Sequence, residues 1–144
     1  MREPAISLQE LEHRLSAEFP GTFGPTGLTI RRIWHGGCEM QQAFHQASLR
    51  PGGTLSGVTM MQLADVAMYV AVLASIGWVP LAVTTSLNIN FLRKPAPQPL
   101  VAECRLIKLG KRLAVGEIAI RSEGETELAA HATSTYSIPA QTAS

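Results

Sequence analysis

The chain has 144 residues, with 12 Lys and Arg against 11 Asp and Glu, so its formal net charge is +1. This length predicts one domain with a sizeable core. Charged residues make up only 16% of the chain, which argues against nucleic acid or an anionic membrane as the main partner. Cys38 and Cys104 lie far apart without metal-ligand spacing. We therefore expect no metal site and two reduced, structural thiols. We also expect a cytoplasmic protein, because the first ten residues lack the apolar segment of a secretory signal.

The N-terminal part predicts one short helix followed by two strands. Ser7 and Glu10 form a capping-box pattern, and leucines then recur at helical spacing, which predicts a helix from about Leu8 to Glu18. Gly21 to Gly27 is rich in glycine and threonine, which is typical of a loop. The two strands are expected at Leu28 to Trp34 and Cys38 to Ala47, joined by a turn at residues 35–37.

The stretch from Gly57 to Ile76 predicts the central helix of the protein. It would be about 30 Å long. It is apolar almost all round, as expected of a helix enclosed by other structure, and its strongly polar side chains are Gln62 and Asp65. An ionised carboxylate in such a place costs several kcal/mol unless it is paired or hydrogen-bonded. Asp65 therefore requires an explanation.

Three explanations of Asp65 compete. It could be a structural acid, hydrogen-bonded to a neighbouring strand. It could be a lone acid in a membrane span, since the apolar run from Val58 to Val83 is long enough to cross a bilayer. The break at Gly77 to Pro80, the absence of flanking basic clusters and the alternating strands that follow all disfavour a membrane span. It could also be a catalytic base or nucleophile on a rigid helix.

The segment from Arg50 to Gly57, R-P-G-G-T-L-S-G, is expected to be a loop that leads into the central helix. The first turn of a helix has backbone N–H groups without intrahelical partners, which can bind an anion or a developing oxyanion. Alternatively, Ser56 is an N-cap and the glycines only make the turn. The residues leave both interpretations open.

Four further strands are predicted after the central helix, and they complete an α+β architecture. Their expected ranges are Leu81 to Leu92, Leu100 to Leu109, Arg112 to Arg121 and Glu127 to Ile138. One long apolar helix among six strands implies an antiparallel sheet curled around that helix. We expect residues 1–26 to form an N-terminal helix and loop, residues 27–138 a single domain, and residues 139–144 a flexible tail.

From Gly27 to Ile138 the chain resembles the hotdog-fold thioesterases, in particular the PaaI-like acyl-CoA thioesterases. That family has approximately N-x-x-G-x-x-H-G-G at the start of its helix and an acidic residue nine positions after the histidine. Here the run is R-P-G-G-T-L-S-G-V, with Asp65 nine positions after Ser56. The strand T-T-S-L-N-I-N-F-L-R-K-P-A and the hairpin L-G-K-R-L-A-V-G-E are also similar to the family. The resemblance implies a hotdog fold.

The resemblance also implies roles for individual residues. Asp65 would be the general base or nucleophile, the Gly57 N–H would polarise the thioester carbonyl, and Thr84 matches a hydroxyl that holds the attacking water in some members. This chain has Arg50 and Ser56 where the family usually has Asn and His. Arg only donates hydrogen bonds whereas Asn also accepts them. A non-catalytic acyl-CoA-binding protein therefore remains the alternative to hydrolysis, and a dehydratase is less favoured because the histidine is absent.

Coenzyme A is expected as part of the substrate, and no separate cofactor is implied. Asn90, Arg93 and Lys94 lie at the end of one predicted strand, and Lys111 and Arg112 lie at a hairpin tip. Clustered cations bind phosphate groups well. The alternative is that these are solvated turn residues.

The spacing of Gly57 and Asp65 predicts an active site shared between two subunits. On one straight helix, residues eight positions apart are separated by about 12 Å along the axis. That is too far for one carbonyl group to meet both, because the reacting atoms must lie within about 3.5 Å. Two antiparallel helices in a symmetric dimer would bring Gly57 of one chain near Asp65 of the other. The resemblance implies such dimers, often paired again into tetramers.

Overall fold

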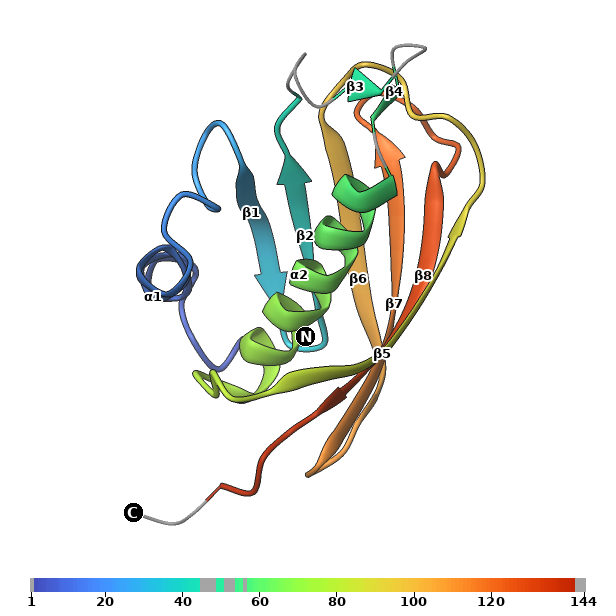
Figure 1. The fold of residues 1–144 in the computed structure, drawn as a ribbon. Helices are drawn as coiled ribbons and strands as arrows, with labels where there is room; N and C mark the ends of the chain where they lie inside the picture. The colour runs from blue at the N-terminus through green and yellow to red at the C-terminus, as the bar shows by residue number, and fades with distance from the viewer. Residues whose placement is uncertain (1, 45–48, 51–53, 56, 142–144) are drawn as a thin grey trace.

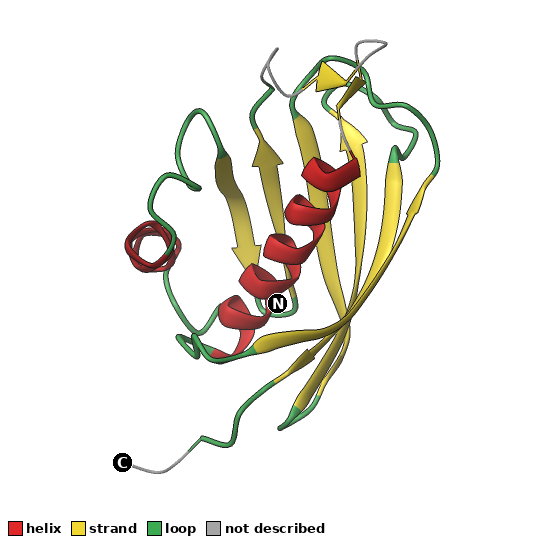
Figure 2. Ribbon diagram, in the orientation of Figure 1, coloured by secondary structure: helices red, strands yellow, loops and turns green. Residues whose placement is uncertain are grey.

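The structure of the protein, a computed structural model, describes residues 2–44, 49–50, 54–55 and 57–141 (Figure 1). In chain order the elements are α1 (Leu8–Glu18), β1 (Leu28–Trp34), β2 (Gly37–Gln42), β3 (Leu49–Arg50), β4 (Thr54–Leu55), α2 (Gly57–Ile76), β5 (Val83–Phe91), β6 (Leu100–Leu109), β7 (Leu113–Ser122) and β8 (Ala130–Ser137). Figure 2 shows that α2 lies across one face of the curved sheet.

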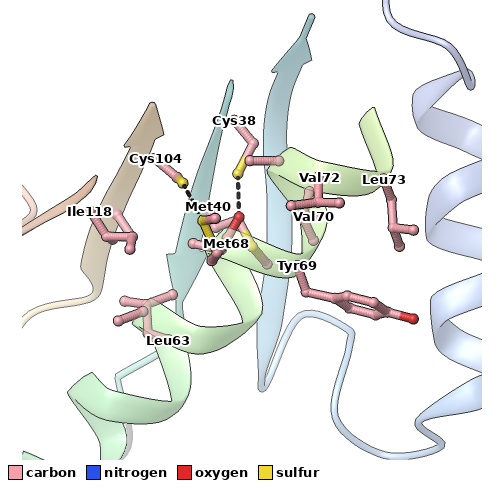
Figure 3. Packing of buried hydrophobic residues seen from close by; sticks show 14 of the residues in the cluster. Cys38, Met40, Leu63, Met68, Tyr69, Val70, Val72, Leu73, Cys104 and Ile118 are labelled. Carbon is pink, nitrogen blue, oxygen red and sulfur yellow. Dashed lines mark hydrogen bonds between the residues drawn. The ribbon is translucent and has the colours of Figure 1, made fainter. Parts of the chain in front are cut away.

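Within the described part of the chain the main sheet has six strands in the order β1-β2-β6-β7-β8-β5, and each neighbouring pair is antiparallel. The sheet curls around α2, as Figure 1 shows. The predicted hotdog fold is therefore confirmed. Leu63, Met68 and Leu73 of α2 are fully buried, and the opposing side chains come from β2, β6 and β7 (Figure 3). The core thus lies between one helix and the inner face of the sheet.

One glycine allows α2 to lie close to the sheet. A Cβ atom at Gly116 on β7 would lie 2.7 Å from the Met68 sulfur and 3.2 Å from the Arg105 carbonyl oxygen. A Cβ contact of 2.7 Å is shorter than real ones, so a side chain here would force Met68 or the neighbouring backbone to shift. Overpacking of this kind typically costs about 1–3 kcal/mol. Gly116 therefore sets the separation of helix and sheet.

The two cysteines are free and buried, as predicted. They face each other across β2 and β6, where Cys38 pairs with Cys104. The Cys38 thiol donates a hydrogen bond to the Ala67 carbonyl oxygen at 3.1 Å, and the Cys104 sulfur lies 3.9 Å from the Met68 sulfur (Figure 3). Burial raises the pKa of the Cys104 thiol to about 12 and also raises the pKa of Cys38. Both thiols therefore serve as core residues.

The N-terminal helix is held firmly against the rest of the fold. Ser7 caps α1 as predicted, because the Glu10 N–H donates to the Ser7 hydroxyl oxygen at 3.1 Å. Leu11 and Leu15 are fully buried on its inner face. Before α1, the Ala5 N–H donates to the Ala74 carbonyl oxygen near the end of α2 at 2.8 Å. These contacts join α1 to the main core.

Several element boundaries differ from the sequence prediction. The strand expected from Leu81 begins at Val83, because the Ala82 N–H donates to the Val79 carbonyl oxygen in a turn. The strand expected at Cys38 to Ala47 begins at Gly37 and ends at Gln42, and the last predicted positions, 45–47, lie outside the described residues. Residues 50–57 were expected to be a loop, yet β3 and β4 pair there as a two-stranded sheet. Strands of two residues are too short to show an alternating hydrophobic pattern, so no signal in the sequence predicted them.

By length and composition α2 could cross a membrane, since its 20 residues are strongly apolar. However, 61% of its apolar window is buried within the fold. The helix also ends at Ile76, so the apolar run that continues to Val83 is not one helix. The packing of α2 against the sheet explains its composition, and α2 is the core helix.

Candidate active site

Asp65 lies in a cleft of about 550 Å³ between α2, the loop after α1 and the start of β5. The lining residues are Phe19, Thr22, Phe23, Gln62, Asp65, Val66, Tyr69, Pro80, Ala82, Val83, Thr84 and Tyr136. Most of them are apolar or aromatic, with a few polar groups gathered beside Asp65. This combination is typical of small-molecule sites.

The Asp65 carboxylate is fixed by a hydroxyl from a neighbouring strand. Asp65 is half-buried on the side of α2 that faces β5, and the Thr84 hydroxyl donates to its Oδ1 atom at 2.6 Å. Within the described residues no second donor to this carboxylate is found, so Oδ2 is available to a water molecule or a substrate. A bond to an ionised group is among the stronger hydrogen bonds. Thr84 thus holds one oxygen and leaves the other for chemistry.

Tyr136 on β8 completes the wall behind Asp65. The Tyr136 hydroxyl lies 3.5 Å from the Asp65 backbone carbonyl oxygen. The Tyr136 residue is the register partner of Thr84 in the pairing of β5 with β8. Burial raises the pKa of the Tyr136 phenol, so the hydroxyl stays protonated at neutral pH. Sequence reasoning missed this residue. Its signal was the alternation along β8, where Ala132, Ser134 and Tyr136 all point inward.

Gly57 lies apart from Asp65, as its spacing along the helix requires. It lines a separate hollow of about 270 Å³ with Phe91, Arg93 and Lys94. A Cβ atom at Gly57 would lie 3.1 Å from the Phe91 ring, so the helix start is packed closely on the end of β5. The structure therefore places Arg93 and Lys94, the first pair of predicted phosphate-binding cations, beside Gly57, whose N–H is predicted to bind the carbonyl.

The second predicted pair of cations lies elsewhere. Lys111 and Arg112 line a hollow of about 430 Å³ with Ile76, at the opposite end of α2 from Gly57. The Arg112 Nε atom donates to the Ile138 carbonyl oxygen at 3.2 Å. Within one chain, then, the two pairs of cations are not brought together.

The remaining predicted residues stand as follows. Arg93 forms an ion pair with Glu127. Asn90 is exposed on β5 and pairs in register with His131 of β8. Ser56 lies outside the described residues, and Arg50 is described only by the backbone of β3. The described part of the chain contains no group of three metal-ligating side chains.

Comparison with known proteins identifies the family. A sequence model described as the Thioesterase superfamily matches residues 52–129, which include Gly57, Asp65 and Thr84. The chain belongs to this superfamily. A candidate esterase of Saccharolobus solfataricus is 30% identical to this superfamily member over 139 residues, covering 96% of this chain and 90% of the relative.

Solved structures of other superfamily members agree. A candidate thioesterase from Silicibacter sp. is 41% identical, with a TM-score of 0.86 and coverage of 95% of this chain and 94% of that one. The phenylacetic acid degradation protein PaaI of Thermus thermophilus, solved as a mutant, shares the fold at 24% identity, with a TM-score of 0.68 over 79% of this chain and 95% of that one. These findings support a hotdog protein of the thioesterase superfamily whose general reaction class is thioester hydrolysis.

We expect Thr84 to act as a positioning residue for this reaction. Thr84→Val keeps the shape but removes the bond to Asp65, so kcat for thioester hydrolysis should fall roughly 10- to 100-fold with KM little changed, since small misplacements of a catalytic group carry costs of that order. Steady-state kinetics would measure both constants. Thr84→Ser, which retains the hydroxyl, should recover most of kcat. An equal loss for the Ser and Val variants would contradict the role of the hydroxyl.

Proposed function

We propose that this superfamily member hydrolyses acyl-CoA thioesters to the free acid and coenzyme A. The observation that carries the proposal is the Asp65 carboxylate, which accepts a hydrogen bond from Thr84 at one oxygen and lines a largely apolar cleft. An apolar cleft suits an acyl group, and a fixed carboxylate suits a base or a nucleophile. Its free, buried thiols are compatible with the cytoplasm as its compartment.

Two chemical routes use the same groups. As a base, Asp65 takes a proton from water while the water oxygen attacks the carbonyl carbon. The C–S bond then breaks, and the departing thiolate receives the proton. As a nucleophile, the Asp65 oxygen attacks the carbonyl carbon itself, the thiolate leaves, and water hydrolyses the resulting anhydride. In both routes a backbone N–H at Gly57 stabilises the oxyanion.

The separation of Gly57 and Asp65 leads us to propose a dimer. β5 is an edge strand of the main sheet, and large apolar side chains are exposed along it and after it: Val83 is 54% exposed, Phe91 50% and Leu92 57%. On the adjacent part of α2, Val58 is 74% exposed and Met61 42%. Such a surface favours association. A two-fold dimer through β5 and α2 would place Gly57 of one subunit by Asp65 of the other. Pairing of dimers into a tetramer is a further part of this proposal.

The same dimer would gather the dispersed cations. If the two α2 helices run antiparallel with Gly57 opposite Asp65, the end of α2 near Lys111 and Arg112 of one subunit lies beyond the Gly57 end of the other, about 16 Å farther along the helix axis. Arg93 and Lys94 already line the hollow at Gly57. Together the two pairs would form a phosphate-binding surface for coenzyme A, near the carbonyl-binding N–H.

The second candidate function is acyl-CoA binding without hydrolysis. It is favoured by Arg50 and Ser56, which replace the Asn and His usual in the related thioesterases. The two functions are separated by measuring hydrolysis and binding on the same ligands.

The first experiment is a panel of acyl-CoA thioesters with free-thiol detection, run on the wild type and Asp65→Asn. Asn preserves the size of the side chain and most of its hydrogen bonding, so the fold should persist while turnover falls by orders of magnitude. Circular dichroism and thermal unfolding check the fold. Tight binding by a wild type without turnover would instead support the binding protein. Unchanged specific activity in the folded fraction of Asp65→Asn would show that Asp65 is structural.

Subunit mixing tests the shared site. Gly57→Pro removes the N–H, and proline is tolerated at the first position of a helix. Asp65→Asn and Gly57→Pro should each be inactive, yet statistical mixing should restore about one quarter of wild-type activity, because half of the dimers carry one intact site. Gly57→Ala, which keeps the N–H and meets Phe91 at a similar distance, is the matched control. No recovery after confirmed subunit exchange would contradict the shared site.

The role of the hairpin cations is tested with a truncated substrate. Replacing Lys111 and Arg112 by Ala should raise KM for a full CoA thioester far more than for the N-acetylcysteamine thioester, which lacks the phosphates. Arg105→Ala, on the outer face of the sheet beside Glu117, is the control cation and should leave the ratio of the two KM values unchanged. Equal effects of the double variant on both substrates would remove the hairpin from the site.

A further inference from the structure

We propose that the segment after α1 selects the acyl group, with Phe19 and Phe23 as specificity-determining residues for apolar acyl groups larger than acetyl. This inference rests on the proposed thioester hydrolysis. It concerns the wall of the cleft that faces away from the reacting carboxylate. Phe19, Thr22 and Phe23 line the same cleft as Asp65 although they precede it by more than 40 positions in the chain.

The wall is a continuous aromatic row. The Phe19 ring meets the Tyr69 ring edge to face, with centroids 6.3 Å apart, and Tyr69 stacks on Tyr136 at 6.0 Å. The Tyr69 hydroxyl donates to the Pro80 carbonyl oxygen at 3.1 Å, which satisfies its polar end, and its largely buried ring supports the more exposed ring of Phe19. Figure 3 shows Tyr69 pointing away from the sulfur atoms of the core and toward the N-terminal helix. The row runs from Phe19 to Tyr136, which lies behind Asp65.

The wall also retains apolar surface that a ligand can cover. Phe19 is 42% exposed even though its ring contacts Tyr69, whereas Tyr69 and Tyr136 are buried at 7% and 4%. Polar groups gather beside Asp65, while the side formed by Phe19 and Phe23 is aromatic. An acyl chain bound through its carbonyl carbon near Asp65 would extend along these rings. An acetyl group has only a methyl group beyond its carbonyl, so it would cover less of the exposed Phe19 ring than a longer chain would.

The segment is built rigidly enough to discriminate. The Thr22 N–H donates to the Phe19 carbonyl oxygen, and the Leu28 N–H donates to the Thr22 carbonyl oxygen at 2.9 Å. A Cβ atom at Gly27 would lie only 2.3 Å from the Thr22 carbonyl oxygen, so the loop closes tightly on itself. Because α1 is anchored by buried leucines, the backbone that carries Phe19 and Phe23 is held in place, and the Phe19 ring also contacts Tyr69.

The family match covers Tyr69 but does not cover Phe19 and Phe23. The superfamily model begins at residue 52, whereas α1 and its loop end well before that position. Asp65 and Thr84 belong to the matched region and serve the reaction. Phe19 and Phe23 lie before the matched residues, so under this proposal the acyl group is selected outside the region that serves the reaction.

The test compares kcat/KM for hexanoyl-CoA and acetyl-CoA in Phe19→Ala, Phe19→Trp and the wild type. Removing the ring should lower the hexanoyl to acetyl ratio roughly 10-fold, the discrimination expected from lost contacts in an apolar pocket. Phe19→Trp fills the cleft and should also lower the ratio, whereas Phe19→Leu should retain most of it. Ile107→Ala, an equally apolar surface residue on β6 that is 61% exposed, should leave it unchanged. Phe23→Leu tests the second ring with less risk to folding than Ala.

Binding separates this inference from the proposed function. The non-hydrolysable thioethers S-hexyl-CoA and S-ethyl-CoA are titrated into the same variants by calorimetry. If the wild type hydrolyses no thioester, the proposed function fails, but a preference for S-hexyl-CoA that Phe19→Ala abolishes still supports the aromatic wall. A ratio that Phe19→Ala and Phe19→Trp leave unchanged, in turnover and in binding, overturns it.

Discussion

The burial of α2 against the inner face of the curved sheet is the constraint on which the rest of the molecule depends. A 20-residue apolar helix must be covered, and β2, β6 and β7 cover it with side chains that are themselves fully buried. Gly116 shows how close the contact is, because Met68 occupies the space that a side chain there would need. The position and direction of α2 therefore determine where its polar residues can emerge.

Asp65 emerges where this cover is incomplete. The sheet reaches its edge at β5, and the side of α2 that faces this edge strand is only half-buried around Asp65. The carboxylate thereby escapes the full cost of desolvation, and Thr84 supplies the hydrogen bond that a half-buried charge requires. The exposed apolar side chains of the same edge are the basis for proposing a second subunit there. The exposed edge of the sheet at β5 thus explains why the Asp65 carboxylate is only half-buried, how Thr84 orients it and where the second subunit is proposed to bind.

The N-terminal segment lines the same cleft as Asp65 from another side, through Phe19, Thr22 and Phe23. The region shared with the superfamily holds Asp65, Thr84 and Gly57, whereas α1 and its loop lie outside the matched residues and close the cleft from the other side. Buried leucines and backbone hydrogen bonds fix this segment, so Phe19 meets Tyr69 of the core helix. Under these proposals the reaction would take place in the matched region, and the acyl group would be selected by the segment that precedes it.

The sequence by itself determined most of the elements and singled out Asp65 as a candidate site residue. Apolar periodicity and capping residues predicted α1, α2 and six of the strands, because those signals are local, and a single acid in an apolar helix marked Asp65. Only the tertiary structure decided the neighbours of that acid. Thr84, Tyr136 and Phe19 come from three distant segments, and no local pattern encodes their meeting, since it depends on the register of β5 with β8 and on the docking of α1. The sequence could also group Arg93 with Lys111 as cations, but the fold places them at opposite ends of α2, because a helix of that length separates its two ends by roughly 30 Å.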